Sequence, residues 1–307
     1  MSNIEIMLTL FVIVIVGFIA GKTGYMGGDF DKRLSNLVID ITCPALILSS
    51  TMQGTLPDRA LILPLLGISL LTYILLTAVA FTVPRFFTRN KADEGVVGFA
   101  LMFGNVGFIG YPVVASIFGH QAVFYAAVLN VVNTFAVFTI GTMLLTDGND
   151  RRHGAFHRQV LYSTPMLAAY LAMLIVALGI DGIPAVISQP LTLIGGITVP
   201  AALLIIGSSM AQLSPRTMLG NRTVYATTAC RLAVIPMGLF FLFSALGFDQ
   251  LVVAVNTVVI AMPVATYGTI LCLKLGRDTT LITEATFITT LLSVLTIPLI
   301  AALFSNL

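Results

Sequence analysis

The sequence has 307 residues, of which 58% are hydrophobic and only 9% are charged, and its mean hydropathy is +1.03. This composition excludes a soluble globular domain and predicts a polytopic membrane protein. The net charge of +2 is small and the basic residues are spread among loops between apolar stretches, so no nucleic-acid partner is expected.

Windows of about 20 apolar residues predict ten membrane-spanning helices joined by short loops, which leaves almost no chain for a soluble domain. The segment before the first span carries Glu5 and no basic residue, so we expect a retained span rather than a secretory signal. The predicted spans are Ile4–Ala20, Ser35–Gln53, Ala60–Pro84, Gly95–Phe118, Gln121–Thr146, Val160–Gly179, Pro190–Ala211, Asn221–Leu246, Leu251–Leu275 and Ala285–Phe304.

The basic residues predict the orientation of the chain. Except for Arg59 and Arg231, every Lys and Arg lies in a loop that follows an odd-numbered span or at the end of a span beside such a loop. The positive-inside rule therefore places these loops in the cytoplasm and both termini on the extracytoplasmic side of the plasma (inner) membrane. A polar segment at 147–159, read as a cytoplasmic loop, separates two sets of five spans (1–146 and 160–307). Because five is odd, the two sets have opposite orientations.

A short motif in span four recurs in span nine. Each copy has Asn, then Ile four positions later, then Pro three positions after that. Further matches link span two to span seven and span five to span ten, so we expect an inverted repeat of five plus five helices. The matched residues are Asn105, Ile109 and Pro112 with Asn256, Ile260 and Pro263, then Ile41–Ala45 with Ile197–Ala201, and Val137–Ile140 with Val294–Ile297.

Proline removes a backbone hydrogen bond, and an unpaired carbonyl in hydrocarbon costs several kcal/mol. The duplicated prolines therefore predict two broken helices, which in repeat-built transporters form the binding site. We expect an unwound stretch around the glycines of span four, with Pro112 at the first position of a second half-helix. Inward-facing helix N-termini would attract an anion such as a carboxylate. The alternative is that these residues only repair a kink, but the duplication favours a site. The predicted substrate-binding residues are Gly104, Asn105, Gly107, Ile109, Pro112, Asn256, Ile260 and Pro263.

Four further polar residues are substrate-binding candidates with equally ordinary structural explanations. Asn130 and Asn133 lie three positions apart on one face of span five, where they either line the same cavity or form interhelical hydrogen bonds. Thr42 and Thr198 lie beside prolines in spans two and seven. They either offer hydroxyls to the site or bond to their own helices.

Ionisable residues inside membrane spans are rare and functional by default. Arg231 in span eight either neutralises an anionic substrate, or snorkels toward headgroups or pairs with a carboxylate. Asp40 in span two is the candidate for binding a coupling proton or cation, with a structural pair or polar packing as the alternative. No cofactor or metal site is expected. Enzyme motifs such as the zinc-protease helix, the nucleophile elbow and the phosphate loop are absent.

With these motifs, the sequence resembles the auxin efflux carrier family, which includes bacterial permeases for malate or malonate and the plant PIN auxin exporters. The resemblance covers nearly the whole chain. The long hydrophilic central loop of many plant members is absent, so the sequence resembles a compact prokaryotic member. The residues that carry the resemblance are the break from Gly104 to Pro112, Pro263, the stretch Arg231–Pro236, and the sequence from Leu178 to Pro184 that leads to Ile197–Ala211.

The resemblance implies a fold similar to that of bile-acid and sodium/proton transporters, in which spans four and nine cross at their unwound centres. It implies a scaffold of spans one, two, six and seven, which forms a homodimer in some relatives. Spans three to five and eight to ten would form a transport domain that moves like an elevator. The family's substrates are mostly organic anions. This sequence has no carboxylate beside either crossover motif, which leaves sodium or proton coupling open.

The leading interpretation is a carrier that exports or exchanges a small organic anion, such as a carboxylate or an auxin-like acid, by alternating access. The alternative is a sodium- or proton-coupled symporter of organic acids or bile-acid-like molecules, with Asp40 as the ion site. The paired breaks disfavour a channel or a non-transporting receptor. The expected partners are the small-molecule anion and membrane lipids.

Overall fold

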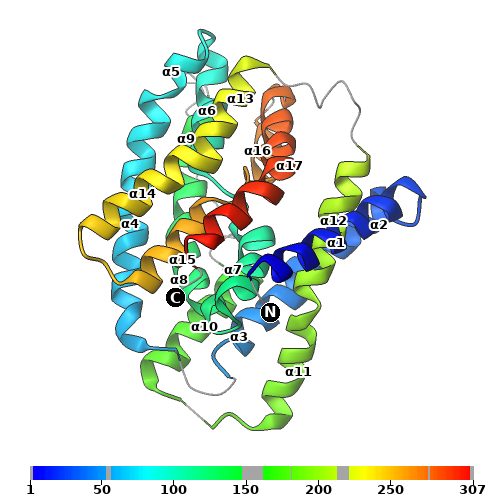
Figure 1. Cartoon of the computed structure of the whole chain (residues 1–307), viewed down its shortest axis with the longest axis vertical. Helices are drawn as coiled ribbons and strands as arrows, with labels where there is room; N and C mark the ends of the chain where they lie inside the picture. Colours follow the sequence, from blue (N-terminus) through cyan, green and yellow to red (C-terminus); the bar gives the residue numbers. More distant parts are fainter. Residues whose placement is uncertain are drawn as a thin grey trace.

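The computed structural model describes residues 3–52, 57–146, 162–180, 182–212, 221–275 and 277–304, and every regular element in these ranges is a helix (Figure 1). The predicted all-α class is therefore confirmed. The predicted cytoplasmic loop at 147–159 lies outside the described residues.

Most of the long helices consist of two or three consecutive segments. Four of the described junctions are single π turns, η1, η3, η4 and η7, which occur mostly as local bulges and often at functional sites. In chain order the elements are α1 (Asn3–Lys22), α2 (Gly28–Leu37), η1 (Val38–Thr42), α3 (Cys43–Ser49), η2 (Arg59–Leu61), α4 (Ile62–Thr82), α5 (Pro84–Phe87), α6 (Lys91–Met102), η3 (Val106–Gly110), α7 (Tyr111–Phe118), α8 (Ala122–Ala136), η4 (Val137–Gly141), α9 (Thr142–Leu145), α10 (Thr164–Leu178), α11 (Ala185–Gly196), α12 (Thr198–Ala211), α13 (Arg222–Ala229), η7 (Cys230–Val234), α14 (Ile235–Ala245), α15 (Gln250–Ile260), α16 (Tyr267–Lys274) and α17 (Thr280–Ala302).

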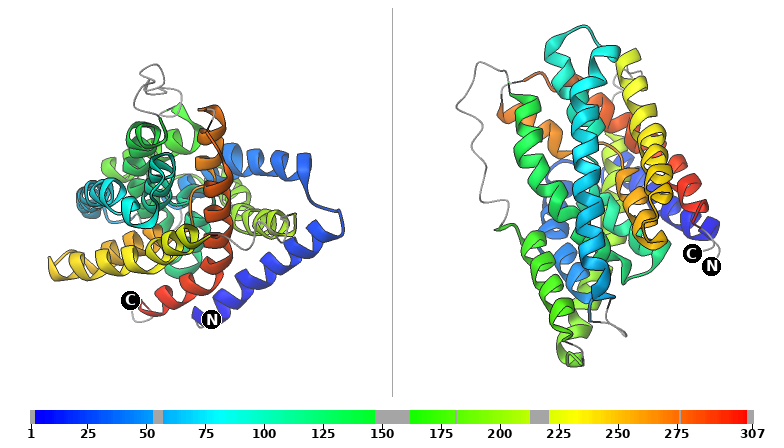
Figure 2. Two further views of the ribbon diagram at one scale, coloured as in Figure 1. Left: turned by 90° about the horizontal axis from the view of Figure 1, so that it is seen from above. Right: turned by 90° about the vertical axis from the view of Figure 1, so that its left-hand side faces the viewer.

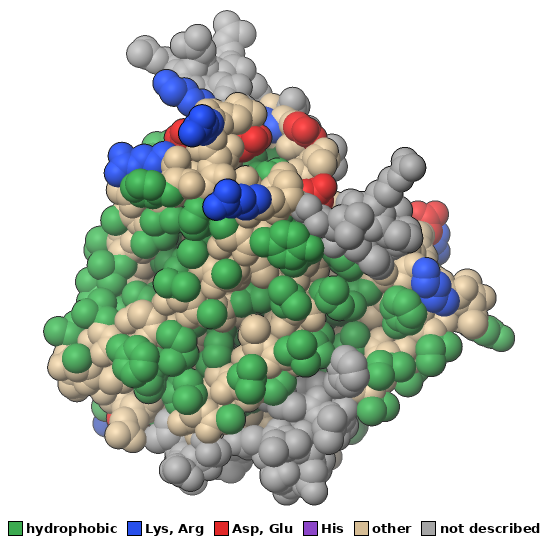
Figure 3. Space-filling model, turned by 45° about the horizontal axis from the view of Figure 1, so that its top comes forward, with side chains coloured by type: hydrophobic (Ala, Val, Ile, Leu, Met, Phe, Trp, Pro, Cys, Tyr) green, Lys and Arg blue, Asp and Glu red, His purple; other side chains and the backbone are tan. Residues whose placement is uncertain are grey.

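Five continuous helical stretches among the described residues are long and apolar enough to cross a membrane. They coincide with predicted spans three, five, seven, eight and ten. The face drawn in Figure 3 is apolar over most of its area, and Lys and Arg side chains gather toward the end where α5 and α13 lie. The five stretches are Arg59–Phe87, Ala122–Leu145, Ala185–Ser208, Arg222–Ala245 and Thr280–Ala302.

Helices α1 and α12 pack closely because glycines stand at their contact. A Cβ atom at Gly17 of α1 would collide with the backbone of Leu204, and one at Gly207 of α12 would collide with the backbone of Val14. Small residues let helix backbones approach one another where lipid tails remove the usual hydrophobic drive for association. The two helices lie side by side at one edge of the molecule (Figures 1 and 2).

The carboxylate of Asp31 fixes α2 to the end of α12. Its Oδ2 accepts hydrogen bonds from Ser208 Oγ at 2.6 Å and from Gln212 Nε2 at 3.1 Å.

The helix α3 packs between α10 and α11, and α11 also contacts α12. Helices α1, α2, α3, α10, α11 and α12 therefore form one contiguous group.

A second group of helices surrounds the break that follows α6. In this group α4 packs against α6 and α8, α13 packs against α17, and α14 packs against α15. The approach of α6 to α4 is close, since a Cβ atom at Gly98 would lie 2.6 Å from the carbonyl oxygen of Ala80. Figure 1 shows α4 on the opposite side of the molecule from α11 and α12.

Replacing Gly17 with Val should destabilise the protein, because the new side chain would overlap the backbone of α12. Overpacking of this kind costs about 1–3 kcal/mol, so the melting temperature of detergent-purified protein should fall by roughly 2–10 °C. Gly67→Val in α4 is the matched control, because Gly67 is exposed and a Cβ atom there meets no atom within 4 Å. Equal melting temperatures for the two variants would contradict the close packing of α1 on α12.

Candidate functional site

Two helical spans are interrupted by short non-helical segments. Residues 103–105 separate α6 from η3, and residues 261–266 separate α15 from α16. Both interruptions lie where the duplicated motif predicts a break. Almost all of their side chains are buried in the protein interior, so their backbone groups need partners inside the protein.

The two interruptions supply those partners to each other. The backbone N–H of Asn105 donates to the carbonyl oxygen of Pro263 at 2.8 Å, and the N–H of Ala265 donates to the carbonyl oxygen of Phe103 at 3.1 Å. These two bonds make an isolated antiparallel bridge. The broken spans therefore meet at their breaks, and the site is built around this contact.

The second half of the first broken span begins one turn earlier than expected. The carbonyl oxygen of Asn105 accepts hydrogen bonds from the N–H groups of Ile109 and Gly110 at 3.1 and 3.0 Å, which starts the π turn η3. Pro112 is the second residue of α7, which follows η3. The expectation that Pro112 is the first residue of the second half-helix is therefore wrong, because Asn105 already nucleates a turn before it.

The first turn of the second half-helix is also contacted by α3. The thiol of Cys43 donates to the carbonyl oxygen of Gly107 in η3, with Sγ at 3.9 Å from the oxygen. A residue at the start of α3 thus contacts the first turn of the second half-helix.

Arg231 lies at the C-terminal ends of the first half-helices. Its side chain is 0% exposed. Its Nη1 donates to the carbonyl oxygens of Leu101 at 3.0 Å and Met102 at 3.2 Å, and its Nε donates to the carbonyl oxygen of Met262 at 3.0 Å. Helix C-termini carry partial negative charge, which the guanidinium offsets here. The side chain therefore neither snorkels to headgroups nor pairs with a carboxylate among the described residues.

Gly104 lets the guanidinium reach these carbonyls. A Cβ atom at this position would collide with Nη2 of Arg231 and would lie 3.2 Å from the carbonyl oxygen of Met262. Any side chain at residue 104 would thus push Arg231 away from the break. The glycine is required by close packing.

The second break is also fixed by α17. The backbone N–H of Val264 donates to Oγ1 of Thr289 at 3.0 Å, and this hydroxyl donates in turn to the carbonyl oxygen of Ala285 at 2.6 Å. Thr289 is fully buried. It therefore ties the non-helical segment before α16 to a continuous helix.

Asn130 and Asn133 belong to a chain of buried and partly buried hydrogen bonds. Tyr73 Oη donates to Asn133 Oδ1 at 2.6 Å, Asn133 Nδ2 donates to Asn130 Oδ1 at 2.8 Å, and Asn130 Nδ2 donates to Tyr111 Oη at 2.9 Å. The ring of Tyr73 also stacks on Phe103 at the break, with a centroid separation of 6.2 Å. The chain joins α4, α8 and α7, which corresponds to the interhelical role considered for the two asparagines.

Asn256 does not occupy the position that Asn105 occupies. Asn105 lies within its break, whereas Asn256 lies inside α15, one turn before Ile260 ends that helix. The amide of Asn256 is 2% exposed and its Nδ2 donates to Oγ1 of Thr72 in α4 at 3.2 Å. The equal spacing of the two motif copies therefore does not make their asparagines equivalent.

The remaining candidates lie away from the bridge between the breaks. Thr198 Oγ1 donates to Thr42 Oγ1 at 2.9 Å, and Thr42 Oγ1 donates to the carbonyl oxygen of its own helix at Val38, at 3.4 Å. These bonds join η1 to α12. Asp40 is exposed, and its Oδ1 accepts a bond of 3.4 Å from Thr164 Oγ1 at the start of α10.

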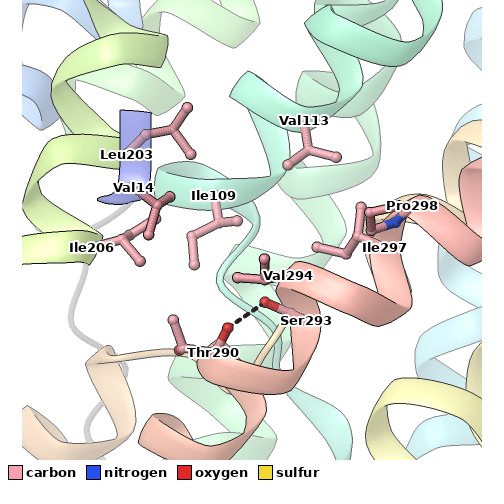
Figure 4. Close-up of a pocket in the computed structure, with 10 residues that line it drawn as sticks. All are labelled: Val14, Ile109, Val113, Leu203, Ile206, Thr290, Ser293, Val294, Ile297 and Pro298. Carbon is pink, nitrogen blue, oxygen red and sulfur yellow. Dashed lines mark hydrogen bonds between the residues drawn. The ribbon is translucent and has the colours of Figure 1, made fainter. Parts of the chain in front are cut away.

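A cavity of about 60 Å³ lies beside η3 (Figure 4). Its walls come from both helix groups, with α1 and α12 on one side and η3, α7 and α17 on the other. It is mostly apolar. Its two hydroxyl residues belong to α17, where Ser293 Oγ donates to the carbonyl oxygen of Thr290 at 2.7 Å. The lining residues are Val14, Ile109, Val113, Leu203, Ile206, Thr290, Ser293, Val294, Ile297 and Pro298.

Gly107 is the partly exposed residue of the first half-turn of η3. A Cβ atom at this position meets no atom within 4 Å, so open space lies beside it. The residue lies in the N-terminal turn of the second half-helix, where backbone N–H groups favour an anion.

Several residues that hold the site were not among the predicted site residues. Thr72 and Tyr73 are adjacent polar residues in an otherwise apolar span, and that pair was a usable signal. Thr289, Thr290 and Ser293 recur at helical spacing on one side of span ten, which is the pattern of a polar helix face.

Comparisons with known proteins give relatives that match almost the whole chain. An "Uncharacterized transporter" of Methanothermobacter thermautotrophicus is 26% identical over 309 residues, covering 97% of each chain. An uncharacterized transporter of Methanocaldococcus jannaschii is 27% identical over 305 residues, covering 97% of this chain and 98% of its own. A protein of Rhizobium meliloti named "Putative malonate transporter" is 23% identical over 303 residues, covering 95% of this chain and 92% of its own.

The family model described as "Membrane transport protein" matches residues 2–155 and 154–301. These ranges include both breaks, Arg231 and every residue that lines the cavity. A transporter family together with several apolar helices indicates a multi-pass membrane protein whose work is transport and not enzymatic catalysis. The chain therefore belongs to the membrane transport protein family, the auxin efflux carrier family that its motifs resemble.

Proposed function

We propose that the protein is a carrier that moves a small organic anion across the membrane by alternating access. The observation that carries this proposal is the backbone bridge between the two broken spans. Repeat-built secondary transporters bind substrate where such half-helices meet. The cavity beside η3 has room for only a few water molecules at about 60 Å³, which favours a closed carrier state over an open channel.

The charges around the bridge favour an anionic substrate. The first half-helices end at Arg231, whose positive charge has no carboxylate partner among the described residues. The second half-helix begins at η3 with its positive N-terminal end. With the negative helix ends offset by Arg231, the N-terminal end of η3 gives the crossing a positive potential inside a low-dielectric interior, where a nearby anion is bound most strongly.

The cavity lining suggests a substrate with an apolar body and few polar groups. Eight of its ten lining residues are aliphatic or proline, and the other two are Thr290 and Ser293. In this proposal a carboxylate lies beside Gly107, and the carbon skeleton of the substrate faces the cavity across Ile109 of the same turn. The relative named as a malonate transporter supports a carboxylic acid as the substrate class.

The elevator interpretation follows from the two helix groups. In this proposal α1, α2, α3, α10, α11 and α12 are the scaffold and the other helices are the moving domain, which corresponds to ten spans in two inverted repeats (1–146 and 160–307). The basic end near α5 and α13 would face the cytoplasm, with both termini outside and the scaffold free to dimerise (Figure 3). A sodium- or proton-coupled symporter is the alternative, with Asp40 as its ion site.

Replacing Gly107 with Val should abolish transport while leaving stability unchanged. The fold has room for the side chain, but the side chain would fill the space in front of the helix N-terminus. We expect malonate efflux from proteoliposomes to fall at least tenfold. Gly238→Val in α14 is the matched control, since Gly238 is exposed with equally open surroundings. If Gly107→Val shows the same efflux rate as the control, the substrate does not bind at this position.

Asn105→Ala should also reduce transport, because the amide is lost at the break while the backbone bonds to Pro263, Ile109 and Gly110 persist. The measurement is a thermal shift with malonate and other carboxylates, with and without sodium. Wild-type protein should be stabilised by at least one anion, and the variant should lose this shift. An unchanged shift in the variant would assign the anion to another site.

Acidification should destabilise the partly buried position of His120 between the two helix groups. His120 Nε2 and Ser49 Oγ lie 2.9 Å apart, joining the loop before α8 to α3. Burial lowers the pKa of His120 below its ordinary value of 6.5, and the bond with Ser49 opposes this shift. A lowered pKa favours the neutral ring, so the stability that the buried neutral ring contributes is present above about pH 6.5 and is lost as the pH falls through the lowered pKa.

If the groups move against each other, the transport rate of the wild type should change between about pH 7.5 and pH 5. His120→Gln keeps a hydrogen-bonding group without a titration and should flatten this part of the pH profile. The same pH profile in both proteins would show that the contact does not limit the movement.

A further inference from the structure

The guanidinium of Arg231 occupies a cluster of backbone carbonyls that has the composition of a cation site. The carbonyl oxygens of Leu101 and Met102 end α6, and that of Met262 follows the end of α15. All three accept from this one side chain at 3.0–3.2 Å. In transporters with broken helices, unwound carbonyls and half-helix C-terminal ends are the groups that coordinate a coupling Na⁺.

Binding of an external cation to this cluster is unfavourable while Arg231 is present. The carbonyls are already bonded, and a second positive charge within about 4 Å would be repelled by several kcal/mol at the effective dielectric of a protein. The described residues also contain no group of three or more acidic, His or Cys side chains that could hold an ion elsewhere. The cluster therefore has its positive charge built in.

We propose that Arg231 replaces a coupling cation, so that transport does not require sodium. This inference rests on the proposed anion transport, and it decides against a sodium-coupled symporter. The close passage of Gly104 past Nη2 supports it, because the backbone at the break is shaped to admit the guanidinium. In a sodium-coupled carrier, a sodium ion brings a positive charge to the site in each transport cycle. Here the positive charge belongs to Arg231 in η7 and stays with the protein.

A purely mechanical tie and a replaced cation make different predictions for Arg231→Ala. A mechanical tie lost with the side chain is not restored by small ions. A vacated cation site is restored by an ion that fits it, which stabilises the folded state in proportion to its occupancy. The probes are sodium and methylguanidinium, each compared with choline at the same ionic strength.

The experiment measures the melting temperature of detergent-purified wild type and Arg231→Ala in each salt. We expect no difference between sodium and choline for the wild type. We expect Arg231→Ala to melt lower in choline and to recover saturably by about 5 °C in sodium or methylguanidinium. Arg222→Ala, at the exposed start of α13, is the control for general salt effects.

If neither sodium nor methylguanidinium stabilises Arg231→Ala, the proposal is overturned and a mechanical tie remains. A sodium requirement for malonate efflux by the wild type would overturn it as well. If Arg231→Ala does not fold, Arg231→Lys replaces it, and sodium-dependent stability of that variant contradicts a built-in cation. The melting measurements need no transported substrate, so an error in the proposed function, seen as absent flux for every anion, is distinguishable from an error here.

Discussion

Backbone groups that leave a helix inside an apolar interior must find partners within the protein, and this constraint organises the centre of the molecule. Two broken spans satisfy this constraint by bonding to each other. Each contributes one N–H and one carbonyl to the bridge through Asn105, Pro263, Phe103 and Ala265. Neither span could be broken alone without leaving these groups unpaired, at a cost of several kcal/mol each. The breaks are therefore a pair, and their mutual dependence fixes where the two halves of the chain touch.

The bridge does not provide hydrogen-bond partners for the helix ends at the breaks. The C-terminal and N-terminal ends find different partners. The C-terminal ends receive Arg231, whose fork of donors suits several carbonyls at once. At the N-terminal end, η3 donates two N–H groups to the carbonyl of Asn105, and within the described part of the chain none to a carboxylate. The result is a centre with its negative ends neutralised and its positive end open, which is the electrostatic basis of the proposed anion site.

The sequence was most informative where the chemistry is carried by residue type. Apolar composition predicted an all-helical membrane protein, and Asn, Gly and Pro in apolar spans predicted where the helices break. The inverted repeat and the substrate site stay predictions. The sequence was least informative where partners are backbone atoms. The carbonyls that bind Arg231 have no residue signature, and neither does the turn that Asn105 starts before Pro112. Asn256 was misplaced relative to its break because equal spacing of motifs does not guarantee equal helix ends.

The bonds around the cavity suggest why the two helix groups could slide past each other. The wall formed by α1 and α12 presents Val14, Leu203 and Ile206, which contribute no hydrogen bond across the cavity. On the opposite wall the hydroxyls of α17 bond to their own helix. Between α3 and the segment from η3 to α8, the hydrogen bonds of the described residues are the weak thiol contact of Cys43 and the pair Ser49 and His120. Movement would thus break few polar contacts, whereas the bridge, Arg231 and the Tyr73-to-Tyr111 chain would travel intact with the moving group.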